Sequence, residues 1–492
     1  MTVHLDTMSL LVAGLGVSGA AVVDTLDSLP SGRRPHQVVT FDERAPGATY
    51  SDVEAIDFTD VSVVVASPGL PPHHPVFVAA RDQNIPVWSE IELAWHLRVP
   101  QAGSQTPAPW LGVTGTNGKT TTVEMLTAIL SQAFSRVATV GNVGQPIIEL
   151  VQDPSIDVFV LELSSFQLHH TYSMELHASA LLNIASDHLD WHGGFEQYAH
   201  DKGKIFHRTH VACFYDPRDR VATSLLEQAD VSEGARAVGV RMVTPGPSEL
   251  GVIDDVLCDR AFAGVTSGIA RYRQADEVGN YNDLAHLAGP DGRIAPHTIS
   301  NALFAAGLAR SVGVSPRDIQ AGLRVFRPGR HRVQRVVDGK RGEGAPVVFY
   351  DDSKATNAHA AQASLRGLPL ERTIWIVGGL TKGASLDELI AEFAPKVKAV
   401  VVIGEDRVGI VEAFRRHAPR IPLADIDHSD TGTVMQRAVE SAWNMSEPGD
   451  AILLAPACAS MDQFRSYADR GEAFEREAHR VVKAVGETNK GE

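Results

Sequence analysis

The sequence predicts an α/β protein of three domains, built on mostly parallel sheets that helices cover. Its length of 492 residues suits roughly three domains of about 150 residues each. Short apolar segments alternate with segments of helical periodicity, which is the order typical of parallel sheets. Several of the apolar segments end in glycine-rich turns or polar side chains, as strands do at the ligand-binding edge of such sheets.

The composition is that of an ordinary globular chain, with 44% hydrophobic and 21% charged residues. A net charge of −16 argues against a nucleic-acid surface, which needs concentrated lysine and arginine. Cys213, Cys258 and Cys458 are odd in number and widely spaced, which fits a reducing compartment and neither a disulfide framework nor a zinc cluster. We expect a cytoplasmic monomer without membrane insertion, because the start does not resemble a signal peptide and no apolar run could span a bilayer.

The first domain is predicted for residues 1–98. Strand Ser9–Ala13 runs into a full G-x-G-x-x-G turn at 14–19, and Asp42 ends the next strand. This pattern most often binds a dinucleotide, although it also occurs as a simple structural turn. Another strand ends in the loop Ser67-Pro68-Gly69, so we predict a small Rossmann-like domain with a ligand at this edge.

A linker is predicted at 99–109, because this segment is rich in proline and polar residues and has no apolar period. The central domain, predicted for 110–328, then opens on a strand, Trp110–Thr114, and a glycine-rich loop. The loop reads Gly115-Thr116-Asn117-Gly118-Lys119-Thr120.

This loop predicts an ATP site. Backbone amides, a helix N-terminus and Lys119 would converge on phosphate oxygens, and Thr120 would ligate the accompanying Mg²⁺. The strict motif would place a glycine where Val113 stands, so the match is partial, and a turn that merely joins strand to helix is the alternative. A helix should start near Lys119, since apolar residues recur at helical spacing. They are Val123, Leu126, Ile129, Leu130 and Phe134.

Polar residues at later strand ends of the central domain predict a metal site. Glu162 ends the segment 157–163, and Asp187-His188 follow the segment 178–184. Carboxylates and a histidine at the edge that carries the phosphate loop would suit one or two Mg²⁺ ions. A solvated acid and a structural histidine are the alternatives for Glu162 and His188.

The remainder of the central domain is less uniform. A helix over 198–206 carries Lys202 and Lys204, and a second, rich in alanine and leucine, covers 300–312 and includes Asn301. The stretch 234–296 has no sustained period. A basic cluster at 327–332 reads either as an anion clamp near ATP or as a cationic helix end.

The third domain, predicted for 329–492, repeats the alternation of strands and helices. Its strands are expected at 347–350, 373–377, 399–403 and 451–454. The strand ends carry lysines, hydroxyls and acids, which predict a pocket for a polar substrate. They lie in the segments 351–357, 378–382 and 456–460.

An ATP domain between two further α/β domains suggests that two substrates meet a γ-phosphate. A carboxylate does not join an amine unaided, because hydroxide is a poor leaving group. Phosphorylation of the carboxylate removes this obstacle, with Mg²⁺ and Lys119 stabilising the transferring charge. The amine must lose its proton, for which a neutral histidine or a carboxylate would serve as base.

The chain resembles the Mur amide ligases of bacterial cell-wall synthesis over nearly its whole length. Within that family it most closely resembles the ligases that add D-glutamate. The resemblance implies that UDP-N-acetylmuramoyl-L-alanine and D-glutamate are the substrates and that the middle domain is a P-loop ATPase-like unit. It rests on the loop 115–120 and on five further motifs. They are 161–167, Asp187-His188, His331-Arg332, 352–357 and 460–464.

The resemblance implies that the first domain holds the UDP part of the substrate and not a dinucleotide. The residues expected to line this site are Val17, Ser18, Asp42, Glu43, Arg44, Gly69 and Asn142. It further implies that Thr120 and Glu162 hold one Mg²⁺ and His188 a second. Lys202 matches the lysine that the family carries as a carbamate, a metal-binding group whose formation needs the neutral amine.

For ATP, the resemblance adds Asn301, Arg332 and Asp352 to the phosphate loop. The expected catalytic residues are Lys119, His188 and Lys202. Cationic and hydroxyl groups would bind the D-glutamate carboxylates. They are Thr356, Lys382 and Ser460, with Tyr467 at a position that is usually phenylalanine.

Other functions fit part of the sequence. Another Mur ligase or a folylpolyglutamate synthase would share the ATP chemistry, but 352–357 and Ser460 argue against them. A non-enzymatic nucleotide-binding switch would need only the loop 115–120 and would leave Glu162, His188 and Lys202 without a purpose. A plain NAD dehydrogenase would leave the ATP motif unexplained.

Overall fold

The computed structural model describes residues 4–142, 144–263, 274–289, 292–430 and 432–488. It divides into two compact units, which are described separately below. Unit 1 comprises residues 1–286 and 296–326, and unit 2 comprises 287–295 and 327–492. Among the described residues, no helix is long and apolar enough to cross a membrane.

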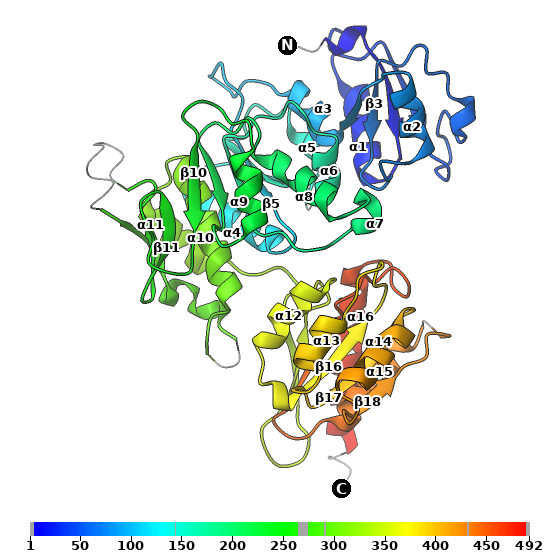
Figure 1. Ribbon diagram of the computed structural model, residues 1–492, viewed down its shortest axis with the longest axis vertical. Helices are drawn as coiled ribbons and strands as arrows, with labels where there is room; N and C mark the ends of the chain where they lie inside the picture. The colour runs from blue at the N-terminus through cyan, green and yellow to red at the C-terminus, as the bar shows by residue number, and fades with distance from the viewer. Residues whose placement is uncertain (1–3, 143, 264–273, 290–291, 431, 489–492) are drawn as a thin grey trace. The chain divides into compact units, whose positions relative to one another are not determined.

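Unit 1 begins with a four-stranded parallel sheet in the order β2-β1-β3-β4. Its strands are β1 (Ser9–Ala13), β2 (Gln37–Phe41), β3 (Val63–Ala66) and β4 (Val87–Ser89). The first three match the expected strands closely, and β4 was missed because it is only three residues long. The helices of this part are α1 (Val17–Ser28), α2 (Pro75–Asp82) and α3 (Glu90–Leu97), with α1 and α2 beside the strands in Figure 1.

The second sheet of unit 1 has nine strands in the order β13-β12-β11-β10-β9-β8-β5-β7-β6. Strands β6 to β11 pair in parallel, whereas β12 and β13 are antiparallel to their neighbours. The parallel strands are β5 (Trp110–Thr114), β6 (Val137–Gly141), β7 (Val158–Glu162), β8 (Ala178–Leu181), β9 (Ala212–Tyr215), β10 (Arg236–Val240) and β11 (Glu249–Ile253). Strands β12 (Val256–Asp259) and β13 (Asp276–Asn280) complete the sheet.

Four of these strands, β10 to β13, occupy the stretch in which the sequence shows no period. Each is four or five residues long, and glycines interrupt three of them, which removes the apolar alternation that would reveal a strand. Pairing with β9 at one side and with each other builds them into the sheet, so tertiary contacts replace the missing local signal.

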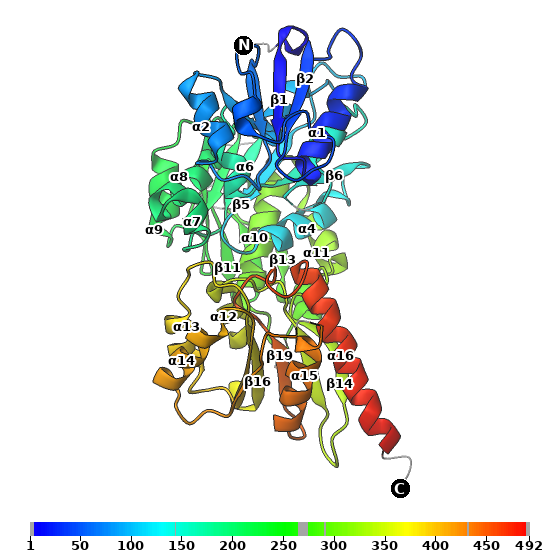
Figure 2. The same cartoon turned by 90° about the vertical axis from the view of Figure 1, so that its right-hand side faces the viewer.

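Eight helices accompany the nine-stranded sheet in the described residues. They are α4 (Lys119–Leu130), α5 (Ile147–Leu150), α6 (Ser165–His169), α7 (Leu189–His192), α8 (Phe195–Gly203), α9 (Arg220–Glu227), α10 (Pro296–Ser311) and α11 (Pro316–Val325). Helix α4 contacts both α10 and α11, as Figure 2 shows. Four residues of its predicted apolar face are buried, whereas Phe134 lies beyond the end of the helix and is partly exposed. Thr122, which we expected off that face, is buried as well, because α4 is covered on more than one side.

The segment 99–109 packs against the central sheet instead of running free. The Gln101 side chain donates hydrogen bonds to the carbonyls of Ile156 and Asp157, at 3.0 and 3.1 Å. The amide of Ala102 donates to the carbonyl of Pro154. These bonds fix the path by which the chain passes from the first sheet to the second.

Unit 2 has a six-stranded sheet in the order β14-β15-β19-β16-β17-β18. All neighbours are parallel except β14 and β15, which pair antiparallel with an irregularity between Arg335 and Val337. The strands are β14 (Gln334–Gly339), β15 (Val347–Asp351), β16 (Thr373–Gly378), β17 (Ala399–Ile403), β18 (Leu423–Asp425) and β19 (Ala451–Leu454). The edge strands β14 and β18 were not predicted, since they are the least buried of the six.

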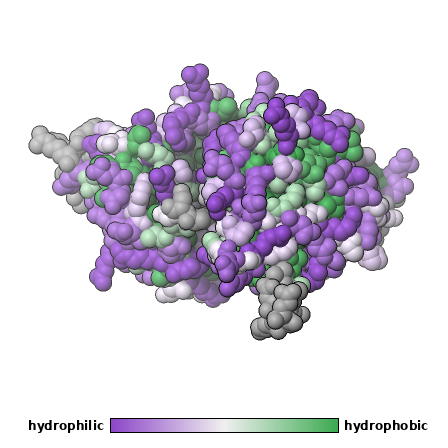
Figure 3. Space-filling view, turned by 90° about the horizontal axis from the view of Figure 1, so that it is seen from below, coloured by the Kyte–Doolittle hydropathy of each residue, from purple (hydrophilic) through white to green (hydrophobic). Residues whose placement is uncertain are grey.

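Helices cover both faces of this sheet and form two separate cores. One face packs against α12 (Ala358–Arg366), α13 (Asp387–Phe393) and α14 (Arg407–His417). The other packs against α15 (Val434–Met445) and α16 (Tyr467–Thr488). Short 3₁₀ segments complete the described elements, at Leu5–Thr7, Val53–Ala55, Lys204–Phe206, Tyr281–Leu287 and Leu370–Arg372. Hydrophilic residues cover most of the face in Figure 3, as expected for a chain with a net charge of −16.

Candidate active site

The loop 115–120 follows β5 and ends at the N-terminus of α4, as predicted. Two of its residues adopt conformations that favour glycine, with φ of 152° at Gly115 and 84° at Gly118. A Cβ on Gly118 would lie 2.7 Å from the side-chain oxygen of Asn301, so this asparagine from α10 borders the loop. Asn183 holds the loop from the other side, because its amide group exchanges hydrogen bonds with the backbone of Asn117 at 2.9 and 3.0 Å.

Two lysines meet at one carbonyl of this loop. The ammonium of Lys119 donates to the carbonyls of Gly115 and Thr116, at 2.8 and 3.0 Å. Lys202, from α8, donates to the same Gly115 carbonyl at 3.0 Å. Two ammonium groups this close repel each other, which disfavours the charged form of at least one of the two amines.

Lys202 is the amine whose charged form is disfavoured. Its side chain is buried, and burial, followed by the positive charge of Lys119, lowers the pKa of Lys202 well below its usual value. Lys204 has a different environment, because it donates to the His169 carbonyl and lies 3.9 Å from Asp201. The geometry thus brings Lys202, and not Lys204, to the phosphate loop.

Glu162 offers an unused oxygen next to this loop. It ends β7 and is 1% exposed, and its Oε1 accepts a hydrogen bond of 2.9 Å from the side chain of Asn142. Its Oε2 is buried and has no hydrogen-bond partner among the described residues. A buried carboxylate oxygen without a donor is costly unless a cation or a ligand satisfies it. Together with the buried hydroxyl of Thr120, this donor set fits a hard cation such as Mg²⁺.

His188 lies at the start of α7, in a left-handed conformation with φ of 52°. Its Nε2 is 3.7 Å from a carboxylate oxygen of Asp187, and its ring stands edge-on to Phe166 at 4.8 Å. The side chain is partly exposed, so the imidazole remains accessible to a ligand.

The predicted UDP residues surround the turn after β1. Asp42 accepts hydrogen bonds from the amides of Leu15, Arg44 and Ala45, at 2.7, 2.8 and 2.8 Å. These backbone bonds lower the pKa of Asp42, so the carboxylate is charged and fixes both loops of the site. Val17 is 80% exposed at the beginning of α1, which leaves an apolar surface beside the turn.

Glu43 lies 3.4 Å from the ring of His74. Gly69, in the loop after β3, and Ser18, in the first turn of α1, lie at the same edge of the sheet. Asn142 comes from the central sheet and is tied to Glu162 by both its backbone and its side chain. Both residues belong to the second sheet, at the ends of β6 and β7. Buried acids join the parts of unit 1 that carry the first and second sheets, since Glu90 accepts from the Ile148 amide at 2.9 Å and Glu92 from the Tyr172 amide at 2.8 Å.

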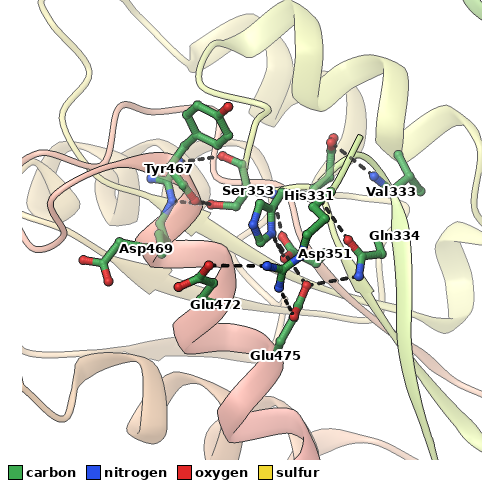
Figure 4. Close-up of polar contacts among 12 residues, drawn as sticks. His331, Val333, Gln334, Asp351, Ser353, Tyr467, Asp469, Glu472 and Glu475 are labelled. Carbon is green, nitrogen blue, oxygen red and sulfur yellow. Dashed lines mark hydrogen bonds and ion pairs between the residues drawn. The ribbon is translucent and has the colours of Figure 1, made fainter. Parts of the chain in front are cut away.

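In unit 2, a buried ion pair holds the segment that carries Arg332. His331 Nδ1 lies 2.6 Å from Asp351 Oδ2, at the end of β15, and Glu475 of α16 lies 3.7 Å from the same nitrogen (Figure 4). His331 and Val333, which flank Arg332, have φ of 65° and 46°, values that side chains rarely adopt. This strained backbone presents Arg332 in a defined direction.

Asp352 directly follows β15 and is buried. Burial raises its pKa to about 6, although Ser364 donates a short hydrogen bond to its carboxylate and Arg332 opposes the shift. Val333 donates its amide to the other oxygen at 3.3 Å. Asp352 and Arg332 are thus neighbours in unit 2, whereas Asn301 and the phosphate loop belong to unit 1.

The predicted amino-acid residues come from loops that the structure joins. Leu380 and Ala459 exchange backbone hydrogen bonds of 3.0 and 2.9 Å, which places the loop of Lys382 beside that of Ser460. Ser460 is buried, whereas Lys382 and Thr356 are exposed. The Tyr467 ring lies 5.1 Å from the ammonium of Lys354.

Sequence reasoning missed Arg470, which supports this region. Its buried guanidinium donates to Ser353 and to the Cys458 carbonyl, at 2.8 to 3.1 Å, and burial lowers its pKa to about 10. Ser353 in turn donates to the Tyr467 carbonyl at 2.7 Å (Figure 4). A lone arginine in a helical segment carries no local sign of such a role.

Sequence reasoning also missed Tyr198, His169, His192 and Asp201. Tyr198 lies 2.8 Å from the hydroxyl of Thr116 in the phosphate loop. His169 and His192 bond to Asp201, which stands next to Lys202. The only signal in the sequence is the density of histidine and aspartate between 169 and 202.

Comparison with known proteins shows which family the chain resembles. Residues 113–234 match the model of the Mur ligase middle domain, and 331–458 match that of the Mur ligase glutamate ligase domain. The chain is 46% identical, over 94% of its length and 96% of the relative, to the UDP-N-acetylmuramoylalanine--D-glutamate ligase of Streptomyces coelicolor. It is 42% identical, over 99% of its length and 100% of the relative, to the ligase of the same name from Bifidobacterium adolescentis.

Among solved structures, the MurF ligase of Thermotoga maritima in complex with ADP has a similar fold. The TM-score is 0.54 at 16% identity, over 98% of this chain and 100% of that one. At this identity the likeness shows the fold alone, which is the α/β architecture predicted from the sequence. The extent and identity of the matches to the curated relatives decide the family: the chain belongs to the Mur ligase family, with the UDP-N-acetylmuramoylalanine--D-glutamate ligases.

Proposed function

We propose that the chain is an ATP-dependent ligase that joins D-glutamate to UDP-N-acetylmuramoyl-L-alanine in the synthesis of peptidoglycan precursors. The observation that carries this proposal is the near full-length identity of 42–46% to ligases of that name. Three features support it: the phosphate loop, the unpartnered oxygen of Glu162 among the described residues, and the lowered pKa of Lys202.

In the proposed reaction, the substrate carboxylate attacks the γ-phosphorus of ATP and ADP leaves. The amine of D-glutamate then attacks the carbonyl carbon of the acyl phosphate, inorganic phosphate departs and the nitrogen loses a proton. Lys119 would stabilise the charge on the transferring phosphate group. Its ammonium lies within the phosphate loop, where it bonds two backbone carbonyls. Phosphate oxygens would replace these carbonyls as acceptors.

ATP would bind to both units of the chain. Gly115, Thr116, Asn117, Gly118 and Thr120 would surround the phosphates with backbone amides and hydroxyls, and Asn301 borders the loop. Arg332 would stabilise phosphate charge and Asp352 would accept a hydrogen bond from the ribose. The proposed domains are 1–98, 110–328 and 329–492, with the linker 99–109 between the first two.

Mg²⁺ would neutralise phosphate charge at two positions. Thr120 and Glu162 would hold one ion, and His188 and a carbamate on Lys202 would hold the second. The neutral amine of Lys202 can add CO₂, whereas an ammonium cannot, so its lowered pKa favours the carbamate. His188, which is partly exposed, is also a possible proton acceptor for the incoming amine.

The two organic substrates would bind to residues of different units. Val17, Ser18, Asp42, Glu43, Arg44, Gly69 and Asn142 would form the UDP site. Asp42 accepts hydrogen bonds from the Leu15 and Arg44 amides, which hold the two loops of this site together. Thr356, Lys382, Ser460 and Tyr467 would bind D-glutamate, whose two carboxylates suit a lysine and hydroxyls.

A pair of lysine variants tests the proposed metal group. Lys202→Ala should abolish ligation, and acetate or formate should restore part of it, because a small carboxylate can occupy the space of the carbamate. Lys204→Ala is the matched control, since Lys204 lies two residues along the same helical segment, and added acetate should leave its rate unchanged. Loss in Lys202→Ala without rescue, together with a lysine of unmodified mass in the wild type, would contradict a carbamate.

A further inference from the structure

A buried network of four polar side chains lies behind the proposed metal site in unit 1. Its centre is Asp201, whose Oδ2 lies 2.7 Å from His169 Nδ1 and 2.8 Å from His192 Nδ1. The other nitrogen of His192, Nε2, lies 2.9 Å from the hydroxyl oxygen of Ser165. A hydrogen-bonded path therefore runs from Ser165 through His192 to Asp201.

Each of the three residues on this path lies in or next to a segment that carries an expected metal ligand. Ser165 begins α6, directly after β7 ends at Glu162. His192 is the last residue of α7, the short helix that begins after His188. Asp201 precedes Lys202 in α8. Since Glu162, His188 and Lys202 come from separate segments, only contacts between these segments can set the distances among the three.

The network is satisfied internally and carries one negative charge. Asp201 is fully buried, and although burial raises its pKa, the hydrogen bonds from His169 and His192 prevail and lower it. Gln197 donates to its other oxygen at 3.0 Å. With both histidines donating from Nδ1, the Nε2 of His192 is an acceptor and Ser165 donates its hydroxyl proton to it.

Aromatic packing extends the network to His188. The Phe166 ring follows Ser165 in α6 and stacks on His192 with a centroid distance of 5.6 Å. The same ring meets His188 edge-on at 4.8 Å. Phe166 thus transmits the position of His192 to His188, which lies at the other end of α7.

Two other roles for these residues fit the geometry less well. Serine, histidine and aspartate occur in the order of a nucleophilic triad, but Ser165 is 2% exposed, so no substrate carbonyl can reach it. The histidines and Asp201 could also surround a transition metal, but the Nδ1 atoms are at hydrogen-bond distance from one carboxylate oxygen that already serves both. A structural role toward neighbouring groups accounts for all the bonds.

We propose that Ser165, His192 and Asp201 form a positioning network that fixes the spacing of Glu162, His188 and Lys202. This inference rests on the proposed function, because it assigns a purpose to the network only if those three residues bind metal. Residues that orient metal ligands from behind commonly change metal affinity 10- to 100-fold when mutated. The network residues never touch the ion or the substrate; they act through the segments they join.

The test measures Mn²⁺ binding directly, by the loss of the free-ion EPR signal at fixed ADP, with ADP and Mn²⁺ alone as the blank. Ser165→Ala and His192→Gln remove single hydrogen bonds of the network, and Ser165→Thr retains the hydroxyl. His200→Ala is the matched control, because His200 stands beside Asp201 in α8 with its side chain 64% exposed. Circular dichroism confirms that each variant is folded.

We expect Ser165→Ala and His192→Gln to bind Mn²⁺ about 10- to 100-fold more weakly than the wild type. Ser165→Thr should regain most of the affinity, and His200→Ala should bind as the wild type does. Folded Ser165→Ala and His192→Gln variants with wild-type Mn²⁺ affinity would overturn the positioning network and leave the proposed function intact. A wild type that binds no Mn²⁺ beyond the blank would instead contradict the proposed metal site and the network with it.

Discussion

Two buried clusters, one in each unit, join a histidine Nδ1 to an aspartate Oδ2, yet the pKa values of the two carboxyl groups shift in opposite directions. In unit 1, His169 and His192 both bond to Asp201, and its pKa is lowered despite its burial. In unit 2, only His331 bonds to Asp351 through a side chain, Glu475 lies close by, and burial raises the pKa of Asp351.

A third buried carboxylate extends the comparison to a site without histidine. Glu90 accepts from the Ile148 amide, and burial raises its pKa to about 7. Among the described residues, the three sites differ in the number of side-chain donors that face the carboxylate, which are three, one and none. Burial raises the pKa of the carboxyl group in all three sites. The donors therefore decide whether the pKa ends below or above its ordinary value.

The largest loss of stability is expected at Asp201, the carboxylate with the most hydrogen-bond donors. Asp201→Asn should lower the free energy of unfolding by about 3–5 kcal/mol, because a neutral amide replaces the anion that three side chains bond, and its NH₂ group cannot accept a hydrogen bond. Urea unfolding followed by circular dichroism measures this change. A loss below that of Asp351→Asn would show that the two histidines do not stabilise the anion.

Glu90→Gln should change the pH dependence of stability. The folded pKa of about 7 exceeds the ordinary value of 4.5, so the folded protein binds more protons between these limits than the unfolded chain. The free energy of unfolding of the wild type should therefore fall, by on the order of 3 kcal/mol, as the pH rises from about 5 to 7.

The variant removes this titration and keeps an oxygen that can accept from Ile148. Its urea midpoint should exceed that of the wild type at pH 8 and equal it at pH 5. Parallel midpoints of the two proteins across this range would mean that Glu90 is ionised in the folded state.

Asp351→Asn should have a smaller cost than Asp201→Asn, about 1–2 kcal/mol. Its raised pKa means that the folded state gains little from the charge, and the amide oxygen can still accept from His331. The same urea experiment, carried out at pH 7 on both aspartate variants, ranks them directly. Equal losses would remove the distinction between the clusters.

The smallest effect is expected at the rim of the unit 2 cluster. Arg330 pairs with Glu472 and Glu475 at 3.4 and 2.7 Å, but its side chain is 58% exposed (Figure 4). Water and salt weaken such a pair, so Arg330→Ala should leave the urea midpoint unchanged within error. A clear shift that persists at high salt would mean that the pair acts as part of the buried cluster.

The sequence predicted the elements whose local patterns are strong. Helix α4 follows from its apolar period, and the central strands β5 and β7 follow from continuous apolar runs that are buried on both faces. The short or glycine-interrupted strands, such as β10 and β18, depend on pairing with neighbours and left no local signal. Val113, where the strict phosphate motif has glycine, fills a buried position of β5.

The site was predictable only where motifs carry it. The loop 115–120 and Glu162 follow from strand-end chemistry, whereas the choice of Lys202 over Lys204 came from the family resemblance. The structure supplies its physical reason, since only Lys202 meets Lys119 at the Gly115 carbonyl. The Asp201 network joins three segments in space, and the positive φ of His331 and Val333 depends on tertiary contacts, so neither could be inferred from spacing.

The central claim is tested most directly by ATP-dependent phosphate release with UDP-N-acetylmuramoyl-L-alanine and a panel of amino acids. The panel comprises D-glutamate, L-glutamate, meso-diaminopimelate and no amino acid, with Lys119→Ala as the control for the phosphate loop. Release with D-glutamate alone, and its loss in Lys119→Ala, is the predicted result. Release with a different amino acid, or none with any while ATP still binds, would contradict the proposed ligase.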